Sequence, residues 1–149
     1  EYVQPQGDEV LLDCFCGVGA FGLLLANGVK RVIGIEASPS AVSDARVNAA
    51  GMENVRLIQG RAEAVLPSLA EKIDAVVLDP PRQGCDVAVL KALVKLAPRT
   101  IVYVSCDPST LARDVHRLAE AGYVLQEATP VDMFPQTYHI ETVALLSNE

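Results

Sequence analysis

Strand-like and helix-like segments alternate along almost the whole of this chain, and this order restricts the fold more than any other feature of the sequence. Short apolar runs predict seven strands, over residues 10–13, 31–36, 55–58, 73–78, 100–104, 123–129 and 140–146. Capping residues and glycine stops predict helices over residues 21–27, 39–50, 62–70, 86–96 and 108–121, the third interrupted near Pro67. The last two strands have no crossover helix between them, so we expect them to pair antiparallel.

This alternation predicts an α/β fold, a doubly wound sheet of seven strands that is mostly parallel and has its last strand antiparallel. The 149 residues have the size of one domain, so we expect a single domain over residues 1–149. Because the chain begins at Glu1 rather than Met and enters a core strand almost at once, we interpret it as a fragment of a longer protein. No apolar run approaches the roughly 20 residues that span a bilayer, and we expect no membrane association.

Charge and cysteine content restrict the partners of the chain. Its net charge of −7 argues against strong nucleic-acid binding by this segment alone, because affinity for phosphates needs clustered Lys and Arg. The Cys14-x-Cys16 pair does not have the spacing of a zinc site, and Cys85 and Cys106 stand apart from it. We therefore predict no metal site, reduced thiols and a cytoplasmic location.

The end of the first predicted strand has features of a nucleotide-like cofactor site. Gly17 and Gly19 follow Asp13 and allow a tight turn that a ligand can approach closely, although a simple strand-to-helix connection would use the same residues. Glu36 ends the second strand, where related folds hold a ribose diol. Asp13 would repel a pyrophosphate, so a cationic sulfonium cofactor fits this pair of acids better than a dinucleotide.

The ends of later strands carry residues suited to covalent chemistry. Asp79 opens a stiff turn with two prolines, which could also be purely structural. Cys106 ends the fifth strand just before a helix, whose N-terminus would stabilise a thiolate, whereas an isolated cysteine is more often buried and inert. Glu141 adjoins a very apolar strand, where partial desolvation would make it a better base, unless it is a solvated residue at a strand edge.

Together these segments resemble the RNA uracil-5 methyltransferases, a family of class I, S-adenosylmethionine-dependent enzymes with a Rossmann-like catalytic domain. The resemblance covers nearly the whole chain. It is carried by Asp13-Cys14-Phe15-Cys16-Gly17-Val18-Gly19-Ala20-Phe21, Leu78-Asp79-Pro80-Pro81-Arg82, Tyr103-Val104-Ser105-Cys106-Asp107-Pro108-Ser109-Thr110-Leu111-Ala112-Arg113-Asp114 and Asp132-Met133-Phe134-Pro135-Gln136-Thr137-Tyr138-His139-Ile140-Glu141.

The resemblance implies a role for each candidate residue. S-adenosylmethionine, converted to S-adenosylhomocysteine, would be bound by Asp13, Phe15, Gly17, Gly19, Ala20, Glu36 and Asp79. Cys106 would add to carbon 6 of a uracil in rRNA or tRNA, and Glu141 would remove the proton from carbon 5. The target base would have to leave its stack to reach the site.

The chain also departs from the family. Arg61 stands where relatives carry Asp or Asn near the adenine, which leaves the adenine contact undefined. The family's N-terminal parts are absent: an RNA-binding barrel, iron–sulfur cysteines in some members, and a segment that adds a Gln to the cofactor site. We therefore expect RNA to be bound largely through those parts.

Three alternatives remain open. The first is a cytosine carbon-5 methyltransferase, which also uses a cysteine. The second is an N-methyltransferase, which is disfavoured because Asp79 replaces the Asn of an Asn-Pro-Pro-Tyr motif. The third is a segment that binds the cofactor but is inactive without its N-terminal domains.

Overall fold

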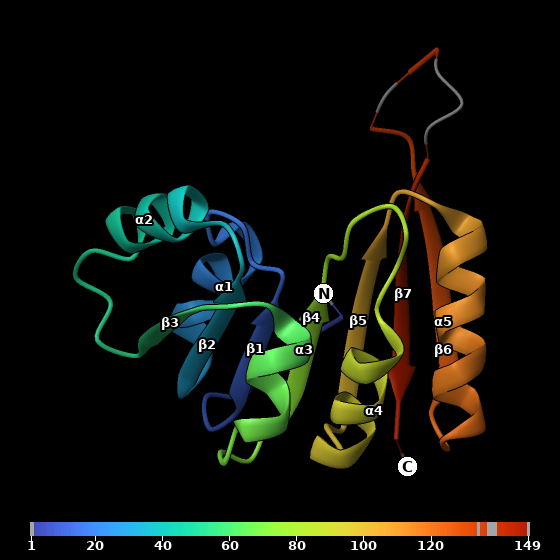
Figure 1. The fold of residues 1–149 in the computed structure, drawn as a ribbon, viewed down its shortest axis with the longest axis horizontal. Helices are drawn as coiled ribbons and strands as arrows, with labels where there is room; N and C mark the ends of the chain where they lie inside the picture. Colours follow the sequence, from blue (N-terminus) through green and yellow to red (C-terminus); the bar gives the residue numbers. More distant parts are fainter. Residues whose placement is uncertain (1, 134, 137–139, 149) are drawn as a thin grey trace.

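The molecule is built on one mixed sheet, and the computed structural model describes residues 2–133, 135–136 and 140–148 (Figure 1). The strands of this part are β1 (Val10–Cys14), β2 (Arg31–Glu36), β3 (Val55–Gln59), β4 (Ala75–Leu78), β5 (Thr100–Ser105), β6 (Val124–Val131) and β7 (Glu141–Ser147). They lie in the order β3-β2-β1-β4-β5-β7-β6, and all neighbours are parallel except that β7 is antiparallel to both β5 and β6. The predicted mostly parallel sheet with an antiparallel last strand is confirmed.

Helices cover both faces of this sheet. They are α1 (Ala20–Leu25), α2 (Pro39–Asn48), α3 (Ala62–Val65), α4 (Val87–Leu96) and α5 (Pro108–Glu120), with short 3-10 turns at Ala26–Gly28 and Leu66–Ser68. Leu12 belongs to an apolar cluster that includes Leu93 of α4 and Leu118 of α5, whereas its neighbour Leu11 packs on the opposite face with Ala26. Adjacent strand residues point to opposite faces, so this division shows that the sheet is doubly wound.

Side-chain caps determine where the helices that follow the strands begin. The Oγ of Ser38 accepts the Ala41 N–H at 3.4 Å, and the carboxylate of Asp86 accepts the Ala88 N–H at 2.7 Å. Asp107 accepts two backbone N–H groups of α5, and a proline follows both Ser38 and Asp107. These contacts satisfy amide groups that the first helical turn leaves free, so α2, α4 and α5 each begin at a defined residue.

Some element boundaries differ from the sequence predictions. The predicted helix over 62–70 is α3 followed by a 3-10 turn, because Pro67 has no N–H to continue an α-helix. The strand expected from residue 73 begins at Ala75, and just before it the Asp74 carboxylate accepts the Val10 N–H at 3.0 Å and pairs with Lys72. No described helix is long and apolar enough to cross a membrane.

The fold brings several chain ends to one edge of the sheet. The parallel strands β1, β2, β4 and β5 all end there, which is where ligands bind in open α/β sheets. β7 starts at the same edge, because it is antiparallel to β5 with Thr142 opposite Ser105. Cys106, which directly follows Ser105, and Glu141, which directly precedes Thr142, therefore lie at this edge.

Candidate active site

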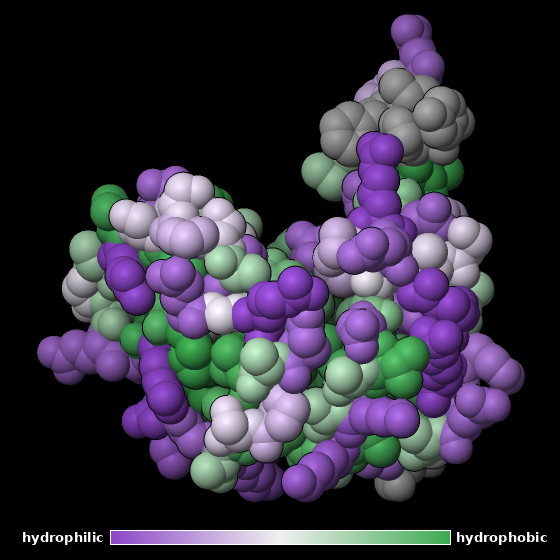
Figure 2. Space-filling model, in the orientation of Figure 1, coloured by the Kyte–Doolittle hydropathy of each residue, from purple (hydrophilic) through white to green (hydrophobic). Residues whose placement is uncertain are grey.

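A pocket of ≈ 570 Å³ opens at this edge, within the size range of small-molecule sites. Its walls come from the ends of β1, β2 and β4 and from the starts of α3 and α4. They are formed by Phe15, Ile35, Glu36, Ala37, Gly60, Arg61, Ala62, Glu63, Asp79, Pro81, Gln83, Gly84, Asp86 and Val89. Figure 2 shows the surface hollowed between the α2 side and the α5 side of the molecule. Five of the lining side chains are charged, and four of these are acidic, so the pocket favours a cationic ligand.

The loop after β1 is bent tightly toward this pocket. The N–H groups of Phe15 and Cys16 both donate to the carbonyl of Ile35, at 2.9 and 3.0 Å, and Phe15 has a left-handed φ of 67°. Gly17 and Gly19 also have positive φ values, 53° and 90°. A side chain at Gly19 would meet Leu23 at 2.7 Å, whereas the space above Gly17 is open. The loop thus presents bare backbone on the side of Gly17, where a ligand can approach.

Glu36 stabilises this loop from the end of β2. Its Oε2 accepts the Gly17 N–H at 3.0 Å, and its Oε1 accepts the Ser38 N–H at 2.7 Å. Each carboxylate oxygen has a further lone pair, so the side chain can still accept hydrogen bonds from ligand hydroxyls. The predicted ribose contact is therefore compatible with this geometry.

Asp13 lies beneath the loop rather than in the pocket wall. Its side chain is 1% exposed, Oδ2 accepts the Gly22 N–H at 2.7 Å, and Oδ1 is buried without a hydrogen-bond partner among the described residues. Desolvation, followed by the charges of Asp79 and Glu36, raises the pKa of Asp13 to about 6. A Cβ at Gly22 would lie 2.8 Å from Oδ2, so a glycine is needed for this contact. Asp13 both fixes the start of α1 and holds an incompletely compensated negative charge that a nearby cation would stabilise.

Asp79, Cys106 and Glu141 follow or begin adjacent strands. Asp79 follows β4 and is open to solvent at the pocket, but the surrounding walls partly desolvate it. This desolvation and the charge of Glu141 raise the pKa of Asp79. Both effects disfavour the ionised form of Asp79, because burial and a like charge each make a carboxylate less stable. Cys106 is half-buried, directly after β5 and before the Asp107 cap.

The four cysteines differ in their access to a substrate. Cys14, Cys16 and Cys85 are buried, and desolvation raises the pKa of each thiol, to about 12 for Cys16 and Cys85. A buried thiol that resists ionisation is a poor nucleophile. Cys106 is the partly exposed one of the four. Among the described residues, no group of three or more His, Cys, Asp and Glu side chains is arranged to hold a metal ion.

The structure thus brings the predicted residues to one region without putting all of them in the pocket wall. Phe15, Glu36 and Asp79 line the pocket, Gly17 and Gly19 belong to the adjoining loop, and Ala20 is the first residue of α1. Arg61 also lines the pocket and pairs with Glu63 at 2.5 Å. Cys106 and Glu141 lie outside the lining, at neighbouring strand ends, and Phe134 and residues 137–139 lie outside the described residues. The roles predicted for these residues stay predictions.

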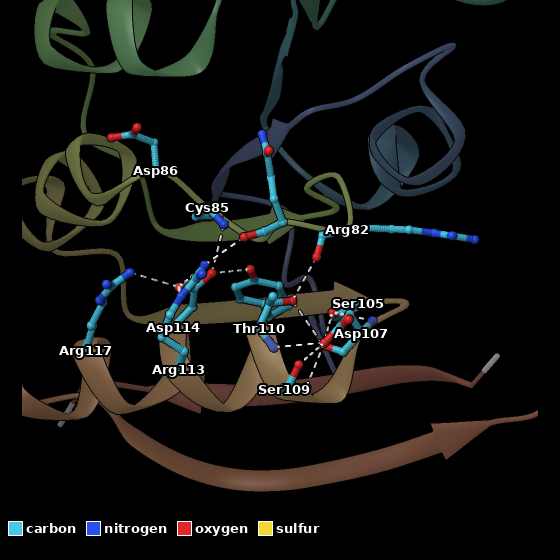
Figure 3. Close-up of polar contacts among 12 residues, drawn as sticks. Arg82, Cys85, Asp86, Ser105, Asp107, Ser109, Thr110, Arg113, Asp114 and Arg117 are labelled. Atoms are coloured by element: carbon cyan, nitrogen blue, oxygen red, sulfur yellow. Dashed lines mark hydrogen bonds and ion pairs between the residues drawn. The ribbon is translucent and has the colours of Figure 1, made fainter. Parts of the chain in front are cut away.

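Sequence reasoning missed three residues on α5 that hold the loop after β4. Thr110, Arg113 and Asp114 project from one face of the helix and contact the segment that contains Arg82 and Cys85 (Figure 3). Their spacing of three and four residues was a visible signal, since residues so spaced lie on the same face of a helix. An aspartate that is 0% exposed at the centre of this group could not be recognised from the sequence.

Comparisons with known proteins agree with this geometry. A protein of Clostridium tetani, described as an uncharacterized RNA methyltransferase, is 47% identical over 152 residues, covering 99% of this chain and 33% of the relative. The chain thus spans about a third of the length of such relatives. The structure of a Pyrococcus abyssi tRNA (uracil-54, C5)-methyltransferase in complex with S-adenosyl-L-homocysteine matches with a TM-score of 0.84 and 36% identity, over 97% of this chain and 36% of that one.

The fold by itself does not distinguish an RNA methyltransferase from a methyltransferase that acts on another substrate. A precorrin-6y C5,15-methyltransferase of Geobacter metallireducens matches with a TM-score of 0.80 at 19% identity, covering 98% of this chain and 84% of that one. At this identity the match shows a shared fold only. The sequence is more specific, because the profile of the tRNA (uracil-5-)-methyltransferase family matches residues 1–149. The chain belongs to the tRNA (uracil-5-)-methyltransferase family.

Proposed function

We propose that the full-length protein transfers a methyl group from S-adenosylmethionine to carbon 5 of a uridine in rRNA or tRNA. The observation that carries this proposal is the position of Cys106. This partly exposed cysteine directly follows β5, which lies between β4, followed by Asp79, and β7, which begins at Glu141, at the edge where the acidic pocket opens. A nucleophile, a candidate base and a cation-binding pocket are the groups that this reaction requires.

The charge of the pocket and its accessible backbone support the binding of the cofactor here. The open space above Gly17 allows close approach to the backbone, and Oδ1 of Asp13, which no described residue hydrogen-bonds, lies in a region of negative charge. S-adenosylmethionine, when bound, supplies a methyl group on a positively charged sulfur. Glu36 would hold the ribose hydroxyls, and Phe15, Gly19 and Ala20 would line the methionine side. A pyrophosphate cofactor would be repelled by the same acids.

Cys106 and Glu141 would act on the uracil in sequence. The Cys106 thiolate forms a bond to carbon 6, and the electrons of the carbon 5–carbon 6 double bond move into an enolate. Carbon 5 then takes the methyl group as the bond between the methyl group and the cofactor sulfur breaks. Glu141 accepts the proton from carbon 5, the double bond forms again, and the thiolate leaves. Dividing the reaction in this way replaces one difficult step by easier ones.

RNA would be held mostly by parts of the full-length protein outside this chain. The net charge of −7 gives this segment little affinity for phosphates, and the related proteins are about three times as long. The target uridine would leave its stack to reach Cys106. Because all four thiols are unpaired and the substrate is RNA, we place the enzyme in the cytoplasm.

Trapping the covalent intermediate tests this proposal. Full-length Cys106→Ala should lose methylation and keep its affinity for S-adenosylmethionine, because the thiol acts on the base. Glu141→Gln should accumulate an RNA–protein adduct through Cys106, because methyl transfer proceeds while proton removal stalls. Denaturing gels with labelled RNA and mass measurement of the linked peptide detect the adduct.

Matched substrates and a cysteine control distinguish the alternatives. Cys14→Ala removes a buried thiol and should give no change in adduct formation. RNA in which the target uridine is replaced by cytidine should not be methylated, and methylation of the cytidine would instead favour the cytosine enzyme. Full activity of Cys106→Ala would refute the covalent mechanism.

A further inference from the structure

The loop over residues 79–85 is bound to the sheet at its start, where the Asp79 N–H donates to the Cys14 carbonyl at 3.3 Å, and further along it is held by one helix, α5. Its Arg82 carbonyl accepts the Thr110 hydroxyl at 3.1 Å, and its Gln83 carbonyl accepts Nη2 of Arg113 at 2.8 Å. The Cys85 N–H donates to Oδ2 of Asp114 at 2.8 Å. Three side chains of α5 thus bind the backbone of three successive parts of the loop, as Figure 3 shows. We call Thr110, Arg113 and Asp114 the α5 clamp.

Asp114 is the centre of the α5 clamp. It is 0% exposed, and its Oδ2 also accepts the Tyr103 hydroxyl at 2.8 Å. Its Oδ1 accepts Nε of Arg113 at 2.9 Å and lies 3.4 Å from Nη1 of Arg117. A buried carboxylate is tolerated only when donors and positive charge compensate it. The loop N–H of Cys85 is one of these donors, so the position of the loop and the compensation of the charge depend on each other.

Gly84 allows the loop to approach the α5 clamp this closely. Its φ is +76°, and a Cβ there would lie 2.5 Å from both Nη2 of Arg113 and Oδ2 of Asp114. Any other residue would push the loop away from the helix. The close contact therefore depends on a glycine in the loop as well as on the side chains of the helix.

The same helix connects the loop to the candidate nucleophile. α5 begins at Pro108, immediately after Cys106 and the Asp107 cap, and the Thr110 hydroxyl also lies 3.2 Å from the Asp107 carbonyl. The loop begins at Asp79, at the end of the strand next to β5. The geometry points to the α5 clamp as a set of positioning residues that fixes Asp79 relative to Cys106. This inference rests on the proposed function.

Removal of one hydroxyl tests the positioning role. Thr110→Val keeps the shape of the side chain but loses the donor to Arg82, and Thr110→Ser keeps the donor. In the full-length enzyme, Thr110→Val should lower kcat for uridine methylation by about tenfold or more, because small misplacements of reacting groups are costly. The KM for RNA and the thermal midpoint should stay near the wild-type values. Thr110→Ser should restore most of kcat, and His116→Ala, on the exposed side of α5, should leave it unchanged.

A second measurement reports on the loop without using the reaction. Cys85 is 4% exposed where the loop meets Asp114, so release of the loop should speed its alkylation by iodoacetamide, followed by mass spectrometry of the Cys85 peptide. We expect faster Cys85 labelling in Thr110→Val and wild-type labelling in Thr110→Ser and His116→Ala. Unchanged labelling and unchanged kcat in Thr110→Val would overturn the inference, and so would faster labelling with unchanged kcat. A wild-type enzyme that methylates no uridine would refute the proposed function instead, while the labelling would still show whether the α5 clamp holds the loop.

Discussion

Replacing Asp13 by asparagine should stabilise this domain at neutral and alkaline pH. Desolvation raises the pKa of this buried carboxyl from 3.8 to about 6 in the folded chain. Because the folded pKa is the higher one, the protonated form contributes stability below pH 3.8, and this contribution is lost as the pH rises through about 6. A difference of about two pKa units corresponds to roughly 3 kcal/mol of destabilisation once Asp13 is fully ionised.

Asparagine retains the shape and the useful hydrogen bond of Asp13. Its amide oxygen can accept the Gly22 N–H as Oδ2 does now, and its amide nitrogen takes the place of Oδ1, which has no partner among the described residues. The gain for Asp13→Asn should therefore be about 2–3 kcal/mol at pH 8 and close to zero at pH 4. For a domain of this size, such a gain raises the thermal midpoint by roughly 5–10 °C.

Urea unfolding of this chain, followed by circular dichroism at several pH values, measures the difference between the two proteins. Asp44→Asn is the matched control, because it removes the same charge from an exposed position on α2. Equal stability of wild type and Asp13→Asn at pH 8 would refute the reasoning, since it would mean that ionised Asp13 carries no desolvation penalty. The variant should also bind S-adenosylmethionine more weakly, because it lacks the charge that favours a cation.

Three further outcomes are expected. Glu36→Ala should weaken cofactor binding in calorimetry by about 1–3 kcal/mol. The control Glu53→Ala, at an exposed position, should leave the affinity unchanged. Equal affinities of wild type and Glu36→Ala would show that Glu36 does not bind the ribose. Gly17→Ala should cost about 1 kcal/mol of stability, because its φ of 53° disfavours a side chain. It should reduce the free energy of cofactor binding by more than this, because the methyl group fills the open space above the loop. A loss of binding free energy no larger than the loss of stability would contradict close approach of the cofactor to Gly17. This chain alone should bind unstructured RNA poorly at about 0.15 M salt, and tight binding in a filter assay would contradict the argument from its net charge.

The sequence alone determined the kind of fold and the edge at which the site lies. Strand periodicity, helix caps such as Ser38 and Asp107, and glycine turns at Gly17 and Gly19 depend on residues a few positions apart, so they can be recognised locally. The predicted third helix ends early because Pro67 has no backbone N–H to continue it. The quoted motifs then identified the family, because they are long and cover most of the chain.

Only the tertiary structure decided how these segments face one another. The insertion of β7 between β5 and β6 brings Glu141 to the end of β5, where its charge adds to the desolvation that raises the pKa of Asp79. Asp13 turned out to lie beneath the loop, bound to Gly22, because packing of α1 on the sheet buries it there. The contact between Asp114 and Cys85 joins residues 29 positions apart. Such contacts depend on the summed packing of distant segments and on desolvation, which no local pattern in the sequence records.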